Sequence, residues 1–112
     1  MYEYNVSIER VVDADTLDVD VDLGFHTHVH VALRLARIDA YEMTTAKGLV
    51  ATAFASDLLS KCAAIRIQST RQEKYGRWLA EVNLRMKSTD VTWLNLNDEL
   101  VRKQHAVYKD YS

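Results

Sequence analysis

An alternation of apolar and acidic residues over positions 17–23 places the firmest limit on how this chain folds. The apolar residues are Leu17, Val19, Val21 and Leu23, and the residues between them are Asp18, Asp20 and Asp22. Side chains two residues apart on a strand face the same way, so this run predicts a strand with one buried and one solvated face. Gly24 follows, and Phe25 opens a second alternating run that ends at Leu35. We therefore predict an antiparallel hairpin that turns near Leu23–Gly24.

The remaining pattern predicts three more strands and two helices. We expect strands over 6–12, 63–68 and 78–84, with tight turns over 13–16 and 73–77. Thr44 or Thr45 is expected to cap a helix that runs to about Cys62, with Val50, Phe54, Leu58 and Cys62 on its buried face. A second helix begins between Asn95 and Asn97 and ends near Gln104. The tail after it is short and aromatic.

The order of these elements suggests an α+β fold. Five strands, with one helix after the third and another after the fifth, match a five-stranded OB-fold β-barrel with two packed helices. This is one α+β arrangement among several that the order allows. Because the 112-residue chain has no proline, no repeat and no linker, we expect a single domain over residues 1–112.

The composition limits which binding partners and which cellular compartment are expected for this chain. The formal net charge is −2, so any affinity for nucleic acid must come from local placement of Arg and Lys. The single cysteine, Cys62, excludes an intramolecular disulfide and suits a reducing compartment. No secretory leader and no membrane-length apolar run is present, so a cytoplasmic location is expected for the chain as it stands, although a removed leader would leave no trace.

A charged cluster begins where the second apolar run ends. Arg34 and Arg37 supply planar donor groups suited to carboxylate or phosphate, and Asp39 and Glu42 supply oxygen ligands or a proton acceptor. Together they could hold a phosphodiester against a metal ion. A solvated ion-pair network at the end of a strand would look the same in sequence. This segment alone leaves both interpretations open.

Four short motifs carry a resemblance to a known family. In chain order they are Asp13-Ala14-Asp15-Thr16, the segment from Arg34 to Glu42, Lys74-Tyr75-Gly76-Arg77-Trp78-Leu79-Ala80, and Asn97-Asp98-Glu99-Leu100-Val101-Arg102. Each is weak alone. In this order and at these spacings the chain resembles the staphylococcal (thermonuclease-like) nuclease family over nearly its whole length.

The resemblance implies a calcium site and a catalytic set. Asp15 and Asp39 correspond to carboxylate ligands of Ca²⁺, and the backbone carbonyl of Ala40 corresponds to the third protein ligand. Asp13 corresponds to a carboxylate beside the metal. Glu42 corresponds to the general base. Arg34 and Arg77 correspond to the pair that grips the scissile phosphate.

The resemblance also implies substrate contacts. Lys74 and Tyr75 correspond to positions near another phosphate of the nucleotide. Tyr108 and Tyr111 are candidates for stacking on a base, with a packing role equally open. The function implied is calcium-dependent hydrolysis of phosphodiester bonds in DNA and RNA with little sequence specificity.

Two other functions stay open. One is a non-catalytic nucleic-acid-binding barrel of the same fold, and the other is an interaction protein whose acidic cluster binds calcium. The complete set of implied acidic and arginine positions favours the nuclease. Two departures are that Tyr41 replaces the usual proline of the family, and that the third, C-terminal helix of the archetype has no counterpart. A trimmed domain or a partner subunit would explain the latter, so monomer and homodimer both remain open.

The histidines of one strand and the two tryptophans are expected to have structural rather than binding roles. His26, His28 and His30 share one strand face at steps of about 6.8 Å, so three cannot converge on one ion, and we expect a solvated face. Trp78 and Trp93 could stack on bases, but we expect them in the core.

Overall fold

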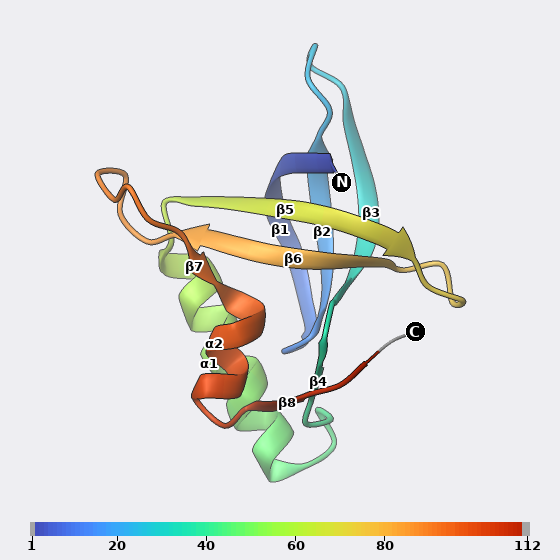
Figure 1. The fold of residues 1–112 in the computed structure, drawn as a ribbon, viewed down its shortest axis with the longest axis vertical. Coiled ribbons are helices and arrows are strands. Elements are labelled where there is room, and N and C mark those ends of the chain that lie inside the picture. Colours follow the sequence, from blue (N-terminus) through green and yellow to red (C-terminus); the bar gives the residue numbers. More distant parts are fainter. Residues whose placement is uncertain (1, 111–112) are drawn as a thin grey trace.

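A five-stranded barrel forms the body of the protein, as predicted. The computed structural model describes residues 2–110. The barrel strands are β1 (Tyr2–Asp13), β2 (Thr16–Asp22), β3 (His28–Leu35), β5 (Ala64–Gln72) and β6 (Trp78–Arg85). They follow the order β3-β2-β1-β5-β6, and a short parallel pairing of β3 with β6 closes the barrel (Figure 1). Closure covers the strand edges where β3 and β6 meet.

Two helices and a two-stranded pair lie below β5 and β6 in Figure 1. Helices α1 (Ala46–Lys61) and α2 (Leu96–Arg102) are the two helices among residues 2–110, and neither is long and apolar enough to span a membrane. Strand β7 (Leu94–Asn95) adds to β6, while β4 (Ile38–Ala40) pairs with β8 (Ala106–Tyr108). The sequence analysis missed these three short strands, because two or three residues carry too little periodicity.

The alternating run forms β2 as predicted, but its last apolar residue leaves the core. Leu17, Val19 and Val21 are buried, whereas Leu23 is 46% exposed. The hairpin extends beyond the barrel (Figure 1), so no opposing sheet covers Leu23. Backbone φ is positive at Gly24, Phe25 and His26, and β3 therefore begins at His28 rather than at Phe25. Its polar face is solvated: His28 Nδ1 lies 2.8 Å from Asp20 Oδ2.

Helix α1 begins at the predicted cap but buries a different face. Thr45 Oγ1 accepts a hydrogen bond from the amide of Gly48 at 2.9 Å. The predicted face was wrong, because Val50 is 60% exposed and its companions Phe54, Leu58 and Cys62 are only half-buried. The buried residues are Gly48, Ala51, Thr52, Ala55 and Leu59. Small side chains on this face let the helix approach the barrel closely.

Helix α2 is joined to the barrel by a buried amide. Asn95 is the cap, since its Oδ1 accepts from the Asp98 amide at 2.9 Å. Asn97, the other predicted cap, is fully buried instead. It accepts from the Val82 amide at 3.0 Å and donates to the carbonyls of Ala36 and Ala80 at 2.9 and 3.0 Å.

The tryptophans lie nearer the surface than predicted. Trp78 is 38% exposed, because it stands at the start of β6 where the barrel wall ends. Trp93 is half-buried, with the guanidinium carbons of Arg66 and Arg85 at 4.6 and 5.1 Å from its ring centroid. The core prediction was wrong for Trp78.

Candidate metal and phosphate site

Asp15 is the buried centre of the site. It lies in the turn between β1 and β2, where its Oδ2 accepts from the Ala40 amide at 2.7 Å and lies 2.9 Å from Arg34 Nη1. The Thr16 hydroxyl donates to Oδ1 at 3.2 Å. Burial raises the pKa of Asp15, while the Arg34 charge and the hydrogen bond from Ala40 act to lower it. A nearby cation therefore stabilises the carboxylate that burial disfavours.

Arg34 joins the two predicted metal ligands. The pairing of β2 with β3 places Arg34 opposite Thr16, next to Asp15 in the chain. Its guanidinium is buried, and Nη2 lies 3.1 Å from Asp39 Oδ1. Asp39 is partly exposed, and Lys109 Nζ lies 3.8 Å from its Oδ2. Residues from the β1–β2 turn, β3, β4 and the segment just after β8 thus form one ion-pair network.

The backbone of Ala40 faces this network. In an antiparallel pair, residues that exchange backbone hydrogen bonds alternate with residues that do not. The Lys109 amide donates to the Arg37 carbonyl, and the Tyr41 amide donates to the His105 carbonyl, so positions 37 and 41 face β8. Ala40 pairs with Ala106 between them and directs its amide and its carbonyl away from β8. The amide reaches Asp15, so the carbonyl lies on that side of the strand too.

The donor set fits calcium. Two carboxylates and a carbonyl are hard oxygen donors, which Ca²⁺ prefers at flexible geometry. Arg34 contacts Asp15 through Oδ2 and Asp39 through Oδ1, and the other oxygen of each carboxylate lies beside Thr16 or Lys109. Within residues 2–110 no three His, Cys, Asp or Glu side chains form a group that could hold a metal. Water and a substrate oxygen would therefore have to complete the coordination.

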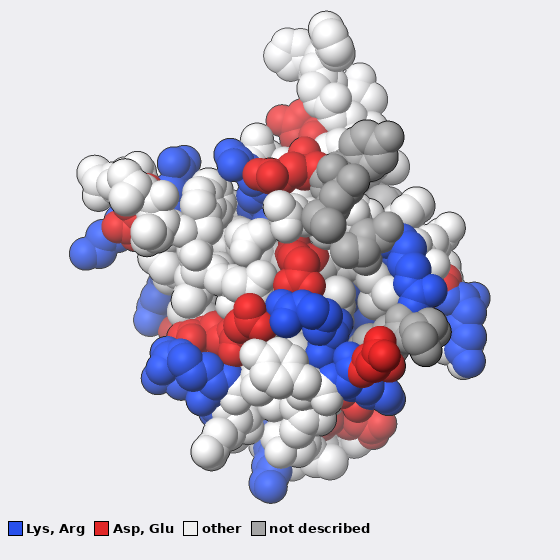
Figure 2. Space-filling model, viewed as in Figure 1, with Lys and Arg blue, Asp and Glu red and all other residues white. Residues whose placement is uncertain are grey.

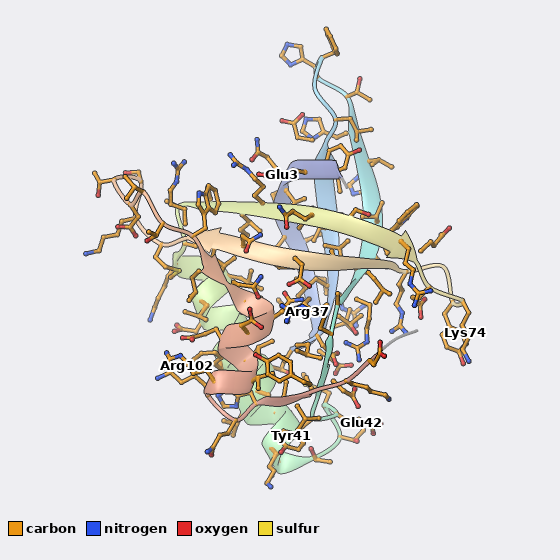
Figure 3. The ribbon with its side chains drawn as sticks, viewed as in Figure 1. Glu3, Arg37, Tyr41, Glu42, Lys74 and Arg102 are labelled. Carbon is orange, nitrogen blue, oxygen red and sulfur yellow. The ribbon has the colours of Figure 1, made fainter. Side chains whose placement is uncertain are left out.

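Asp13 lies beside this network and Glu42 lies apart from it. Asp13 is half-buried, and its negative charge helps to raise the pKa of Asp15. Glu42 is exposed, and its side chain makes no hydrogen bond or ion pair with the described residues. Its carbonyl accepts from the amide and hydroxyl of Thr45 at 3.0 and 2.8 Å. Figure 3 shows Glu42 just before α1, beyond β4.

The β5–β6 turn holds the other predicted phosphate contacts. Glu73 accepts from the amides of Tyr75 and Arg77 at 2.9 Å and from Arg77 Nη2 at 3.1 Å, which lowers the pKa of Glu73. Arg77 immediately precedes β6, and Leu79 of that strand pairs with Arg34 on β3. Tyr75 is 72% exposed, with Lys74 Nζ 5.0 Å from its ring. Lys74 lies at the tip of the turn, well away from Glu42 (Figure 3).

A comparison with protein families now decides the relationship. The family model described as "Staphylococcal nuclease homologue" matches residues 32–112. The chain belongs to this family. A search of curated proteins found no match. Asp13 and Asp15 precede the matched range, but Asp15 contacts Arg34 and Ala40, which lie within it.

The protein departs from the usual pattern of staphylococcal nuclease homologues at Tyr41. The Tyr41 amide donates to the His105 carbonyl at 3.4 Å, a hydrogen bond that proline cannot make. Lys47 Nζ lies 5.2 Å from the centroid of the Tyr41 ring. The loop before Glu42 is thus tied to the segment between α2 and β8 and to α1, rather than stiffened by a proline ring. In place of a third helix, the described chain after α2 forms β8.

Tyr108 is anchored at one end and open along its ring. Its hydroxyl donates to Asp98 Oδ1 at 3.0 Å, and the residue is 59% exposed. The anchored hydroxyl and the exposed ring are compatible with packing and with stacking alike. Tyr111, the other candidate for stacking on a base, lies outside the described residues.

Arg37 forms a network that the sequence analysis did not find. Its guanidinium contacts Glu81 at 2.7 and 2.6 Å and Asp98 at 3.0 Å, and these bonds raise its pKa. Its backbone φ is +67°, a conformation that costs a non-glycine residue roughly 1–2 kcal/mol. The partners Glu81 and Asp98 are 44 and 61 residues away from Arg37 in sequence, so no local sequence pattern predicts these contacts.

Proposed function

We propose that this staphylococcal nuclease homologue is a calcium-dependent phosphodiesterase that cleaves DNA and RNA with little sequence specificity. The observation that carries the proposal is the convergence of Asp15, Arg34 and Asp39, with the Ala40 carbonyl on the same side. A surface ion pair would not need an arginine buried between two carboxylates. Contacts of this kind recognise the phosphate groups that all nucleic acids carry rather than base edges.

Asp15, Asp39 and the Ala40 carbonyl would hold the ion. A bound calcium ion supplies charge that screens the phosphodiester and stabilises the developing negative charge. The guanidinium groups of Arg34 and Arg77 are proposed to donate to oxygens of the scissile phosphate. Because Arg34 is buried, its hydrogen bonds to the developing charge are stronger than they would be in water.

Glu42 is the proposed general base. It follows the predicted ligands Asp39 and Ala40 in the chain, and its side chain makes no hydrogen bond or ion pair with the described residues. Its exposed side chain can accept a proton from the attacking water, while its backbone is fixed by Thr45. Lys74 and Tyr75 are proposed to contact a flanking phosphate, and Tyr108 and Tyr111 a base.

Replacing Glu42 by glutamine tests the proposal. In millimolar calcium, wild-type protein should release fluorescence from a quenched single-stranded DNA oligonucleotide. Glu42→Gln should cut the rate by about 10²–10⁴, the usual contribution of a general base, without loss of stability. Glu9→Gln is the matched control, because Glu9 is an exposed carboxylate paired with His30 on the outer face of the barrel. Equal rates for wild type and Glu42→Gln would contradict the proposal.

A non-catalytic barrel is the second candidate. Arg34 already bonds to both predicted calcium ligands, which is a stable arrangement without any metal. In that case the protein would bind the oligonucleotide without cleaving it. Retained binding with no cleavage in calcium would favour this candidate over the enzyme.

A further inference from the structure

A pocket of about 540 Å³ adjoins the candidate site. Arg37, Arg71, Leu79, Tyr108 and Lys109 line it, among others. Lys109 also approaches Asp39, so the pocket opens beside the proposed calcium ligands. Its volume lies in the range of small-ligand pockets, which suits one nucleotide. Figure 2 shows basic and acidic side chains next to one another across the middle of this face.

One wall of the pocket is a chain of contacts that ends on an aromatic ring. Glu81 on β6 binds Arg37 through both of its carboxylate oxygens. Arg37 binds Asp98 on α2, and the same oxygen of Asp98 accepts from the Tyr108 hydroxyl. In Figure 3 Arg37 lies at the junction of α2 with the barrel. Residues of β6, the β3–β4 turn and α2 therefore fix the orientation of Tyr108 on β8.

We propose that Arg37 is a positioning residue, which holds Tyr108 through Asp98 as a stacking platform for an unpaired nucleobase in this pocket. The inference rests on the proposed function, because it assigns the nucleotide next to the scissile phosphate. Stacking on Tyr108 uses a face of the nucleobase that is covered by neighbouring bases in duplex DNA. The ligand expected in this pocket is therefore a nucleotide of a single strand.

The geometry shows how Arg37 acts. Its guanidinium carbon lies 6.0 Å from the Tyr108 centroid, at the outer limit of a cation–π contact, so direct attraction is weak. The hydrogen bonds that join Arg37 to Asp98 and Asp98 to Tyr108 therefore contribute more to the position of the ring than the cation–π contact does. Arg37 also keeps a left-handed backbone conformation that glycine or asparagine would adopt more easily. The need for a guanidinium group that reaches both Glu81 and Asp98 explains why an arginine occupies this position.

The test measures stacking without cleavage. Glu42→Gln protein in calcium is titrated into a single-stranded thymidine oligonucleotide that carries one 2-aminopurine, whose fluorescence falls when it stacks. Adding Arg37→Gln should weaken binding about tenfold and remove most of the quenching, as should Tyr108→Phe, which keeps the exposed ring and loses only the Asp98 bond. Arg102→Gln is the matched control: Arg102 makes a similar two-pronged contact with Glu99, on the other side of α2 in Figure 3.

Each outcome decides the inference. With Glu42 intact, Arg37→Gln should raise KM about tenfold and leave kcat within about twofold. Quenching that survives Arg37→Gln and Tyr108→Phe, or is lost equally in Arg102→Gln, would overturn the role of Arg37, and so would a failure to bind the oligonucleotide. Binding and quenching without cleavage by wild-type protein would refute only the proposed enzyme activity.

Discussion

Gly48 sets the distance between helix α1 and the loop that carries Glu42. A Cβ atom at this position would lie 1.5 Å from the Glu42 carbonyl oxygen and 2.9 Å from the Met43 nitrogen. Both neighbours are backbone atoms, and Thr45 holds the same carbonyl. A side chain at 48 can therefore be admitted only if the loop moves.

Gly48→Ala should displace Glu42 and lower kcat. We expect a loss of about tenfold or more in rate, because small shifts of a catalytic group are costly, and a loss of roughly 1–3 kcal/mol in unfolding free energy from overpacking. Cleavage assays and urea denaturation measure the two. Leu49→Ala, at the next and largely exposed position, is the control and should change neither. A fully active Gly48→Ala would show that the loop position does not matter.

At the level of elements, Asn97 does what an apolar core residue could not. Its side-chain oxygen accepts from the backbone amide of Val82, and its side-chain NH₂ donates to the backbone carbonyls of Ala36 and Ala80. All three contacts lie at the junction of α2 with the barrel. Unpaired buried backbone groups are costly, so one side chain holds the helix in register with β6 and the β3–β4 turn.

Asn97→Ala should destabilise the protein far more than Asn95→Ala. Removal of Asn97 takes the side-chain partner from the Val82 amide and the Ala36 carbonyl, while the Ala80 carbonyl keeps its hydrogen bond from the Ala36 amide. We expect a loss of roughly 2 kcal/mol or more in unfolding free energy. Loss of the Asn95 cap should cost about 1 kcal/mol. Chemical denaturation of both variants gives the comparison. Similar losses would mean that water replaces the Asn97 contacts.

The contrast between these two asparagines shows what sequence can predict. Caps and alternating strands follow local rules, so the barrel strands were predicted, and Thr45 and Asn95 were each one of two candidate caps. The inward face of α1, the burial of Asn97 and the partners of Arg37 depend on residues distant in sequence. For the site, the resemblance named Asp15, Arg34 and Asp39, and the structure brings them into contact. It could not foresee that Arg34 binds both carboxylates, which needs the β2–β3 register and β4 together.

At the scale of the whole molecule, three arginine–carboxylate pairs link the pH to stability. Hydrogen bonds from Arg77, Arg37 and Arg102 lower the pKa values of Glu73, Asp98 and Glu99 below their ordinary values of 4.5, 3.8 and 4.5. The unfolded chain then binds more protons between each ordinary value and the lowered one. These pairs stabilise the fold above the ordinary values, and that contribution disappears as the pH falls through the lowered pKa values. Asp15, with a raised pKa, acts in the opposite sense.

Unfolding free energy should therefore fall as the pH is lowered from about 5 to about 3. The arginine of each pair is in part open to solvent, although Glu99 itself is buried, so the fall should be gradual. Glu99→Gln should flatten it, because this variant removes one of the three groups and lies away from the candidate site. Urea denaturation across the range measures the slope. Stability that rises on acidification would contradict the assignment and would mean that Asp15 outweighs the three pairs.

Calcium titration of cleavage tests the central claim most directly. Wild-type protein should cleave the quenched oligonucleotide in calcium and stop in EDTA. Asp39→Asn should raise the half-saturating calcium concentration by about tenfold or more, since a carboxylate ligand is lost. Asp57→Asn, which changes an exposed aspartate on α1, should leave it unchanged. Cleavage that persists in EDTA, or an equal calcium requirement in Asp39→Asn, would contradict a calcium site built on Asp15, Asp39 and Ala40.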